Sequence, residues 1–590
     1  MKWVVNDPAR FLHERAELGR LEHEVDWLAT TWRIDTNGSV EVDFNIMVHG
    51  HTYTGRMTYP DVFPNSPPHI CPLDPSERWT IHQYGAGGSL CLEWRADNWQ
   101  THVTGADIIK SAFDLLSAEN HPVKSVSVPS AHCVTEGQSM RNETNRFVVT
   151  NELIQTLLAL PQHTKATLKS HTILHNTATI GFVSEISTNE SSVTTITDLP
   201  VGISTYLPLF AYKGDGWVFK SETFIPGATI DSPDDLLDML AEFGLHSDDL
   251  LVKKEGSNNF SEKMVILFAH ELTSIRIFLI KPREQAAISE YKVIMPSDSD
   301  PRLPKECEQL SSVRVGIVGL GSIGSKVAVS LARSGIRRFL LVDDDYLVPG
   351  NLVRHDLSWT SVGVHKVNAV RDALKLVAAE VDVDVQIHRV AGQESALSAA
   401  TVLKDLANCD LLIDATANPE VFLRIAAVAK VNKKPMCWGE LFASGCGGLI
   451  ARARPDLDPN PLAIRSAIHS HLATVPPAPF QQTSGYDIEQ EQPLIAYDSD
   501  VGQIAALLTR ISIDTALQNV PSQFPHPVYL IGMRKEWIFE QPFDTRPIAP
   551  QGEGWDGATG VVTEEERMAA LKEVLEIYGE TRRVESDSTL

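Results

Sequence analysis

Cysteine is scarce in this 590-residue chain, and none of its cysteines stands in a CxxC pair. An odd, scattered set argues against a disulfide framework and favours reduced thiols in a cytoplasmic protein. Without CxxC pairs, a structural zinc site built from four cysteines is not expected. The seven cysteines are Cys71, Cys91, Cys133, Cys307, Cys409, Cys437 and Cys446.

Long apolar runs and basic residues are also in short supply. No window approaches the roughly 18 apolar residues of a transmembrane helix, and the start lacks the apolar core of a secretory signal. Lys and Arg number 51 against 76 Asp and Glu, which gives a net charge of −25. This balance argues against a general nucleic-acid or anionic-membrane surface, so neither is expected among the partners.

The composition, 43% apolar and 22% charged, is typical of a globular protein, and the chain is long enough for several domains. Residues 1–150 predict an α+β domain, and residues 151–305 a mixed α/β linker or adaptor domain. Residues 306–540 alternate strands and helices, which predicts an α/β domain with a Rossmann-like parallel sheet. Residues 541–590 predict a C-terminal helix and a frayed tail.

The N-terminal region places one cysteine in a specific setting. Asp7 and Pro8 predict the start of a helix that runs to Glu24, and an antiparallel meander and a proline-rich segment follow. In "GSLCLEWRADNW", Cys91 then lies between a Gly/Ser turn and a short apolar strand. A free cysteine is more often a small buried hydrophobe than a nucleophile, so the neighbours must decide its role.

A glycine loop opens the α/β region. "VGLGSIGS" places Gly319, Gly321 and Gly324 in GxGxxG spacing between a predicted strand and helix. Such glycines allow phosphate to approach a helix N-terminus. Asp343 ends the next predicted strand, where an acid can hold ribose hydroxyls. Alone, this pattern predicts a dinucleotide or adenine-nucleotide site, and it leaves a nicotinamide dehydrogenase open.

The next segment, "VDDDYLVPGNLVRHDLSWTSVGVHKVNAV", is more specific. It orders Asp345, Asn351, Arg354 and Lys366 behind the glycine loop. Hydride transfer has no need of these cations, whereas adenylation uses cations near the α-phosphate as a carboxylate attacks and pyrophosphate leaves. Asp345 or Asp414 is a candidate ligand for Mg²⁺. Singly, Arg354 and Lys366 read as solvated charges, but the ordered set favours adenylation.

At this point the chain shows a family resemblance. Residues 310–535 resemble the adenylation domain of the ThiF/MoeB/ubiquitin-activating (E1) family, which implies ATP and Mg²⁺ as cofactors and a homodimer. The family pattern GxGxxG, DxD, NxxR and GxxK is matched by Gly319 to Gly324, Asp343/Asp345, Asn351/Arg354 and Gly363/Lys366.

Residues 1–150 resemble a ubiquitin-conjugating (E2) domain. The resemblance implies that Cys91 carries an activated acyl group as a thioester, which an amine then attacks. His82 matches the His of the family's His-Pro-Asn motif, but Gln83 and Tyr84 follow it, so the Asn is missing. Backbone donors or Tyr84 are possible substitutes, and His82 itself reads as structural. The matched positions are Tyr59/Pro60, Pro64, His82, Cys91 and Trp99.

The two halves together resemble E1–E2 fusion proteins of bacterial antiphage operons. In one group (CBASS) this implies that the activated partner is the C-terminus of a cyclic-nucleotide synthase. In the other group it is a ubiquitin-like protein, and in both the acceptor is a lysine of a target protein. The resemblance therefore implies an ATP-dependent ligase of ubiquitin-like conjugation.

Two departures from the family pattern matter. The region after "PMCWGEL", about 454–499, lacks the second cysteine that many activating enzymes carry in their crossover loop. The acyl group then passes directly to Cys91, or through Cys446, or through an oxyester on Ser484, although serine without a base is a weak nucleophile. In "DATAN", Ala417 replaces a family Asp while Asp414 is kept, which weakens the Mg²⁺ assignment.

Two rival functions stay open beside the ligase. A sulfur-carrier-protein adenylyltransferase would share the adenylation step but would pass the acyl group to sulfur, and the conjugating-like region argues against it. A non-catalytic scaffold with an inactive conjugating-like domain is favoured by the missing Asn. It is disfavoured by Cys91, Arg354 and Lys366 in one chain.

Overall fold

The computed structural model describes most of the chain: residues 2–120, 135–174, 177–189, 192–198, 211–222, 224, 230, 232–245, 263–269, 274–281, 287–296, 302–378, 380–442, 445–477, 496–552, 554–555 and 563–587. The chain divides into two compact units, Met1–Arg141 and Asn142–Leu590. The second unit contains two separate eight-stranded sheets, and each is described by itself.

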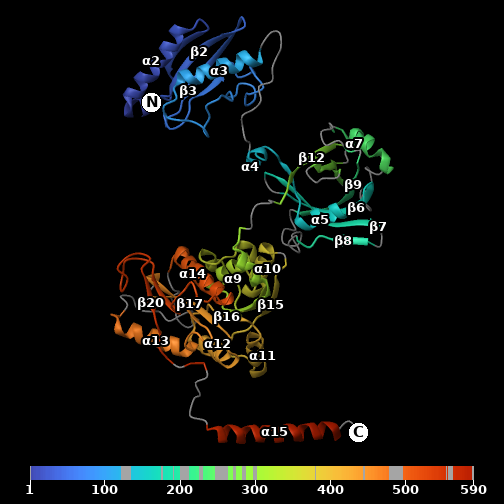
Figure 1. Cartoon of the computed structure of the whole chain (residues 1–590), viewed down its shortest axis with the longest axis vertical. Coiled ribbons are helices and arrows are strands. Elements are labelled where there is room, and N and C mark those ends of the chain that lie inside the picture. The colour runs from blue at the N-terminus through green and yellow to red at the C-terminus, as the bar shows by residue number, and fades with distance from the viewer. Residues whose placement is uncertain are drawn as a thin grey trace. The chain divides into compact units, whose positions relative to one another are not determined.

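The N-terminal unit follows the predicted order of helix, meander and proline-rich segment, and a further long helix comes after them (Figure 1). The first long helix begins where Asp7 accepts a hydrogen bond from the Arg10 amide at 2.9 Å. The proline-rich segment ends in an edge strand, the position that a sheet allows to proline. The elements are α1 (Lys2–Asn6), α2 (Pro8–Glu24), β1 (Leu28–Ile34), β2 (Val40–Val48), β3 (His51–Tyr59), β4 (His69–Pro72) and α3 (Gly105–Glu119).

A buried carboxylate joins the helices of this unit to its sheet. Glu14 on α2 accepts hydrogen bonds from the Tyr59 hydroxyl at 2.9 Å and from the Gly105 amide at 2.7 Å. Arg10 approaches the same carboxylate at 2.8 Å. Burial raises the pKa of Glu14, and these partners oppose that shift. The group therefore ties α2, β3 and the start of α3 together.

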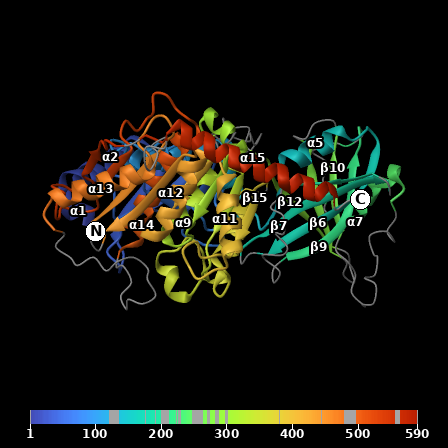
Figure 2. The same cartoon turned by 90° about the horizontal axis from the view of Figure 1, so that it is seen from below.

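The middle sheet has the order β5-β12-β11-β10-β9-β6-β7-β8. Strands β6, β7 and β9 run side by side in it (Figure 2). Ser232 caps the helix α7, and a 3-10 turn η1 follows and ends at Gly244 with φ +65°. The elements are β5 (Asn145–Val148), α5 (Asn151–Ala159), β6 (Thr164–Leu174), β7 (Thr179–Asn189), β8 (Ser192–Thr195), β9 (Ala211–Lys220), α7 (Pro233–Leu240), η1 (Ala241–Phe243), β10 (Lys263–Phe268), β11 (Arg276–Lys281) and β12 (Ala287–Ile294). The short helix α4 (Glu136–Ser139) belongs to the end of the N-terminal unit.

The C-terminal sheet has the order β15-β14-β13-β16-β17-β18-β19-β20. Its first five strands are parallel, as predicted, but the last three pair antiparallel, so the sheet is mixed. Four residues separate β17 from β18, too few for the crossover that a parallel pair needs. The strands are β13 (Arg314–Val318), β14 (Arg338–Val342), β15 (Asp382–Gln386), β16 (Leu411–Asp414), β17 (Met436–Phe442), β18 (Gly447–Ala453), β19 (Val528–Gly532) and β20 (Thr545–Ile548).

Helices cover both faces of this sheet (Figure 1). Helices α9, α10 and α14 pack on one face around Val327, Val370 and Leu508, and α11, α12 and α13 cover the other around Leu406 and Phe422. This sandwich brings the strand ends, which carry the predicted site, to one edge. The remaining elements are η3 (Lys305–Ser312), α9 (Ser322–Arg333), η4 (Pro349–Val353), η5 (Trp359–Ser361), α10 (Lys366–Val377), α11 (Ala396–Ala407), α12 (Pro419–Asn432), α13 (Pro461–Thr474) and α14 (Asp498–Ala516).

The last helix, α15 (Glu564–Asp587), corrects one expectation. The frayed tail was expected to begin at Arg582, but the helix continues to Asp587, and neither glycine nor proline occurs between Gly579 and that end. None of the described helices has both the length and the apolar character needed to cross a membrane.

Candidate functional site

The glycine loop joins β13 to α9, and its three glycines serve different purposes. Gly319 has φ +85° and donates its amide to the Val342 carbonyl at 2.9 Å. A Cβ on Gly324 would lie 1.9 Å from the Gly319 carbonyl oxygen, so glycine is required there. A Cβ on Gly321 would meet nothing within 4 Å. Gly319 and Gly324 therefore shape the loop, and Gly321 leaves open space at the N-terminus of α9, where an anion is stabilised.

Asp343 ties this loop to the next strand. Its Oδ2 accepts the Leu320 amide at 2.6 Å and its Oδ1 accepts the Asp345 amide at 2.9 Å. Burial raises the pKa of Asp343, and the positive charge of Lys366 opposes that shift. The residue predicted to hold ribose thus also braces the loop, at the carboxyl end of β14.

The predicted cation Lys366 lies beside the predicted acid Asp345. Lys366 begins α10, is only 8% exposed, and its Nζ pairs with the Asp345 carboxylate. Its amide also donates to the Asp345 carbonyl at 2.9 Å. The structure therefore brings these two predicted site residues together across 21 positions of sequence.

Asn351 and Arg354 lie on the short turn between them. The Asn351 Oδ1 accepts the Val348 amide at 3.0 Å and so caps η4. Arg354 is half-buried and follows η4 directly. In this structure the asparagine therefore acts on its own turn, and its turn sets the position of the arginine.

His355 is a site residue that the sequence analysis missed. Its Nε2 lies 2.8 Å from the Leu320 carbonyl oxygen, and its Nδ1 accepts the Leu357 amide at 3.3 Å. Burial lowers the pKa of His355 to about 4. The ring is therefore neutral at pH 7, and Nε2 donates to the glycine loop. The sequence did place His355 directly after Arg354, which could have marked it as a site residue. The spacing of residues could not show that its ring would reach the Leu320 carbonyl.

Acidic groups gather at the carboxyl ends of β16 and β17. Asp414 pairs in register with Val318, directly before the glycine loop, and its Oδ1 accepts the Thr416 amide at 3.0 Å and hydroxyl at 2.7 Å. Burial raises the pKa of Asp414 to about 6. Burial also raises the pKa of Glu440 on β17 to about 7, with a smaller contribution from the Asp414 charge. The Arg465 charge lowers both.

The carboxylates at this edge can be compared with the ligands that the expected Mg²⁺ would need. Mg²⁺ is usually held by one or two carboxylates together with phosphate oxygens, and an all-protein cage is not needed. No group of three or more His, Cys, Asp or Glu side chains that could hold a metal occurs among the described residues. Asp414 fits the carboxylate role, since Thr416 orients it and its burial leaves its negative charge poorly compensated. Ala417, where the family carries an Asp, offers no further oxygen.

In the N-terminal unit, Cys91 lies on a turn that folds back on residue 82. Its amide donates to the His82 carbonyl at 2.8 Å, and its side chain is partly exposed. The His82 ring faces the Glu119 carboxylate, with 3.4 Å between Nε2 and Oε1. Glu119 also accepts the Ile81 amide at 3.2 Å. These contacts favour a structural role for His82, the alternative preferred from the sequence.

The other candidate nucleophiles fare differently. Cys446 is fully buried, its thiol donates to the Glu536 carbonyl at 3.6 Å, and burial raises its pKa. Burial raises the pKa of Cys437 to about 11. Both features oppose an acyl-carrier role, because the thiolate is the nucleophile. Ser484 and Cys133 lie outside the described residues.

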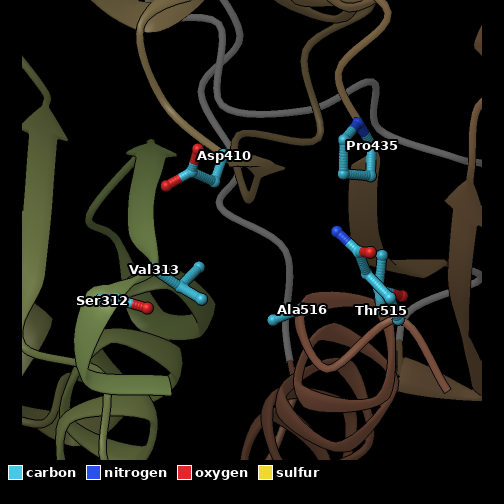
Figure 3. Close-up of a pocket in the computed structure, with 7 residues that line it drawn as sticks. Ser312, Val313, Asp410, Pro435, Thr515 and Ala516 are labelled. Atoms are coloured by element: carbon cyan, nitrogen blue, oxygen red, sulfur yellow. The ribbon is translucent and has the colours of Figure 1, made fainter. Parts of the chain in front are cut away.

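A cavity of about 280 Å³ lies at the opposite edge of the C-terminal sheet (Figure 3). Val313, Asp410 and Pro435 directly precede β13, β16 and β17, so this edge is formed by the amino ends of the strands. The candidate nucleotide site lies at the carboxyl ends, where open α/β sheets bind ligands. The lining residues are Ser312, Val313, Asp410, Pro435, Thr515, Ala516 and Gln518.

Parts of the chain are similar to known proteins. Residues 300–460 match the ThiF family. The chain is 29% identical over 198 residues to the uncharacterized protein y4oA of Sinorhizobium fredii, covering 31% of this chain and 32% of that protein. It is 32% identical over 129 residues to the ATP-dependent ubiquitin transferase-like protein Cap2 of Vibrio cholerae, covering 20% of each. Escherichia coli MccB, solved with AMPCPP and MccA, is similar at 18% identity and a TM-score of 0.31, over 42% of this chain and 66% of that one.

These matches confirm the resemblance predicted for the adenylation region and for bacterial E1–E2-like proteins. They cover only about a third of the first relative's length and a fifth of the second's. The family match includes the glycine loop, Lys366 and Asp414, and it does not extend to Cys91.

Proposed function

We propose that this chain is an ATP-dependent ligase of ubiquitin-like conjugation, acting in bacterial antiphage defence. Its ThiF-type domain adenylates the C-terminal carboxylate of a partner, either a ubiquitin-like protein or a cyclic-nucleotide synthase. The acyl group passes to Cys91 and then to a lysine amine of a target protein. The observation that carries the proposal is the edge at which the open Gly321, the Lys366–Asp345 pair and the buried Asp414 follow adjacent strands.

In the first step, a carboxylate oxygen of the partner bonds to the α-phosphorus of ATP and pyrophosphate leaves. The N-terminus of α9 and the charges of Lys366 and Arg354 stabilise the phosphates, and Asp343 holds the ribose. Mg²⁺, bound with Asp414 as a ligand, would neutralise phosphate charge. Asp345 releases Lys366 to the phosphates or shares it with them, because their ion pair lies at this edge.

In the second step, the Cys91 thiolate attacks the acyl carbon, a C–S bond forms and AMP leaves. The burial of Cys446 and Cys437 supports direct transfer to Cys91, as does the lack of cysteine in residues 454–499. The amine of a target lysine then attacks the thioester, the C–S bond breaks, and an amide forms. The amine proton passes to water.

The experiment is intact mass spectrometry of the chain after incubation with ATP, Mg²⁺ and a candidate partner encoded beside it. A partner-sized adduct that reductant removes, and that Cys91→Ala lacks, supports Cys91 as carrier. Cys71→Ala is the matched control, since Cys71 lies in the same unit on β4. An adduct that survives reductant and persists in Cys91→Ala would instead place the covalent chemistry on a hydroxyl such as Ser484 or on a lysine.

The adenylation site is tested by Lys366→Ala, with Lys375→Ala at the other end of α10 as control. Removing one group that stabilises developing charge typically costs about 100-fold or more in rate, so Lys366→Ala should lose adduct formation and Lys375→Ala should keep it. Adduct at the wild-type rate in Lys366→Ala would show that the site is wrongly assigned.

The two rivals give different results in the same assay. A sulfur-carrier adenylyltransferase would consume ATP but would need sulfide or a persulfide donor to release its product. A scaffold would bind no ATP in calorimetry. The scaffold is favoured by one observation, the engagement of His82 with Glu119.

A further inference from the structure

The turn around Cys91 is built as a short antiparallel pairing. Gln83 and Leu90 form a β-bridge, the Tyr84 amide donates to the Ser89 carbonyl at 3.0 Å, and the Cys91 amide donates to the His82 carbonyl at 2.8 Å. Side chains alternate between the two faces of such a pairing. Gln83 and Leu90 are 6% and 7% exposed and so take the inner face. Tyr84 and Cys91 share the outer face as diagonal neighbours, within reach of a long side chain.

Glycines make this close approach possible. A Cβ on Gly88 would lie 1.9 Å from the Tyr84 carbonyl oxygen, and Gly87 has φ +66° with its Cβ position 2.4 Å from the Pro75 carbonyl oxygen. Larger residues would push the turn open. The glycines therefore keep the two strands of this pairing close together, so that Tyr84 and Cys91 lie near each other.

Two other polar side chains, which precede this turn, are engaged elsewhere. His82 faces Glu119 at 3.4 Å. The Gln83 Oε1 accepts the Trp79 amide at 2.8 Å, and its Nε2 donates to the Glu77 carbonyl at 3.1 Å. His82 and Gln83, at the first two positions of the family's His-Pro-Asn motif, thus serve the local fold, and Tyr84 stands at the third.

Tyr84 is placed differently. Tyr84 is 67% exposed, its phenol makes a hydrogen bond with the Cys91 thiol, and this contact raises the pKa of Tyr84. Arg95 is close enough to act electrostatically on both groups. The hydroxyl and the Arg95 charge, which also pairs with Asp97 at 3.0 Å, therefore lie near one partly exposed sulfur.

We infer that Tyr84 is a catalytic residue of the acyl transfer, which donates its O–H to the Cys91 sulfur when that sulfur carries negative charge. The inference rests on the proposed function. Before the thiolate attacks, and again as the amine displaces it and the C–S electron pair returns to sulfur, the phenol and Arg95 stabilise the charge on sulfur. Hydrogen bonding to the charged form favours that form. No proton leaves the phenol in either step.

The test that needs no partner is alkylation of Cys91 by iodoacetamide across pH, followed on the Cys91 peptide by mass spectrometry. Tyr84→Phe should move the pH profile upward and slow alkylation at pH 7 by about 3- to 10-fold. Tyr53→Phe, which removes a phenol elsewhere in the same unit, should leave the profile in place. An unchanged profile in Tyr84→Phe would overturn the inference.

The test of catalysis is single-turnover discharge of the Cys91 thioester to free lysine. Tyr84→Phe should slow discharge about tenfold, the loss expected from one hydrogen bond to a charged group at about 1.4 kcal/mol. Discharge at the wild-type rate would overturn the catalytic role. A shifted alkylation profile without any adduct on the wild-type chain would overturn the proposed function and leave the Tyr84–Cys91 hydrogen bond standing.

Discussion

The glycine loop yields a paired prediction, because two of its glycines face opposite surroundings. In Gly324→Ala the new Cβ would lie 1.9 Å from the Gly319 carbonyl oxygen, whereas real contacts essentially never fall below 3.0 Å. The backbone must then move by about 1 Å. Strain of this kind costs about 1–3 kcal/mol, and the better helix propensity of alanine returns at most about 1 kcal/mol. We expect a net loss of about 1–2 kcal/mol in the free energy of unfolding.

Gly321→Ala is the matched partner. Its Cβ would meet nothing within 4 Å, and its φ of −72° suits alanine. The free energy of unfolding should therefore stay the same or rise by about 0.4–1 kcal/mol, because alanine lowers the conformational entropy of the unfolded chain. The methyl group would nevertheless occupy the space at the N-terminus of α9, so ATP affinity should fall at least tenfold.

Scanning calorimetry and titration calorimetry with ATP separate the two effects. Gly324→Ala should melt a few degrees lower, since about 1 kcal/mol corresponds to roughly 2–4 °C in a unit of this size. Gly321→Ala should melt like the wild type but bind ATP poorly. The reasoning would be refuted if Gly324→Ala melted at or above the wild-type temperature, or if Gly321→Ala bound ATP normally.

Two further predictions concern buried charge. The pKa of Glu440 is raised to about 7 from an ordinary 4.5, so the folded state keeps a proton that the unfolded chain has lost, and stability falls as pH rises through that window. Glu440→Gln should thus be more thermally stable than the wild type at pH 8 and little different from it at pH 4.5. Each unit by which the pKa is raised corresponds to about 1.4 kcal/mol of this gain. An equal gain at both pH values would contradict this reasoning. Arg452 is fully buried on β18 and pairs with Asp514 at 2.6 Å. Arg452→Met should lower the free energy of unfolding by about 3–5 kcal/mol in denaturant titration, because it leaves Asp514 as a buried charge, and Arg452→Met/Asp514→Leu should recover part of that loss; a double variant no better than the single would count against the pair.

Local features of the sequence determined much of the fold. The helix at Pro8–Glu24 ends where predicted, because N-caps, proline and apolar spacing act within a few residues. The strands around the glycine loop were predictable for the same reason. The antiparallel half of the C-terminal sheet was not, since the βαβ pattern does not extend past the short β17–β18 connection.

The candidate site divides along the same line. The order Asp343, Asp345, Arg354 and Lys366 was readable from spacing alone, because the two acids follow strand β14, Arg354 follows the turn η4 and Lys366 opens helix α10, all of which local sequence specifies.

Only the tertiary structure decided which side chains meet. It set His355 against Leu320 and Asp414 beside the glycine loop, it engaged His82 with Glu119, and it buried Cys446. These contacts join segments that are separated by tens of residues. The sequence alone determined what each segment carries, whereas packing of the sheet and its helices determined the burial and the partners that set its chemistry.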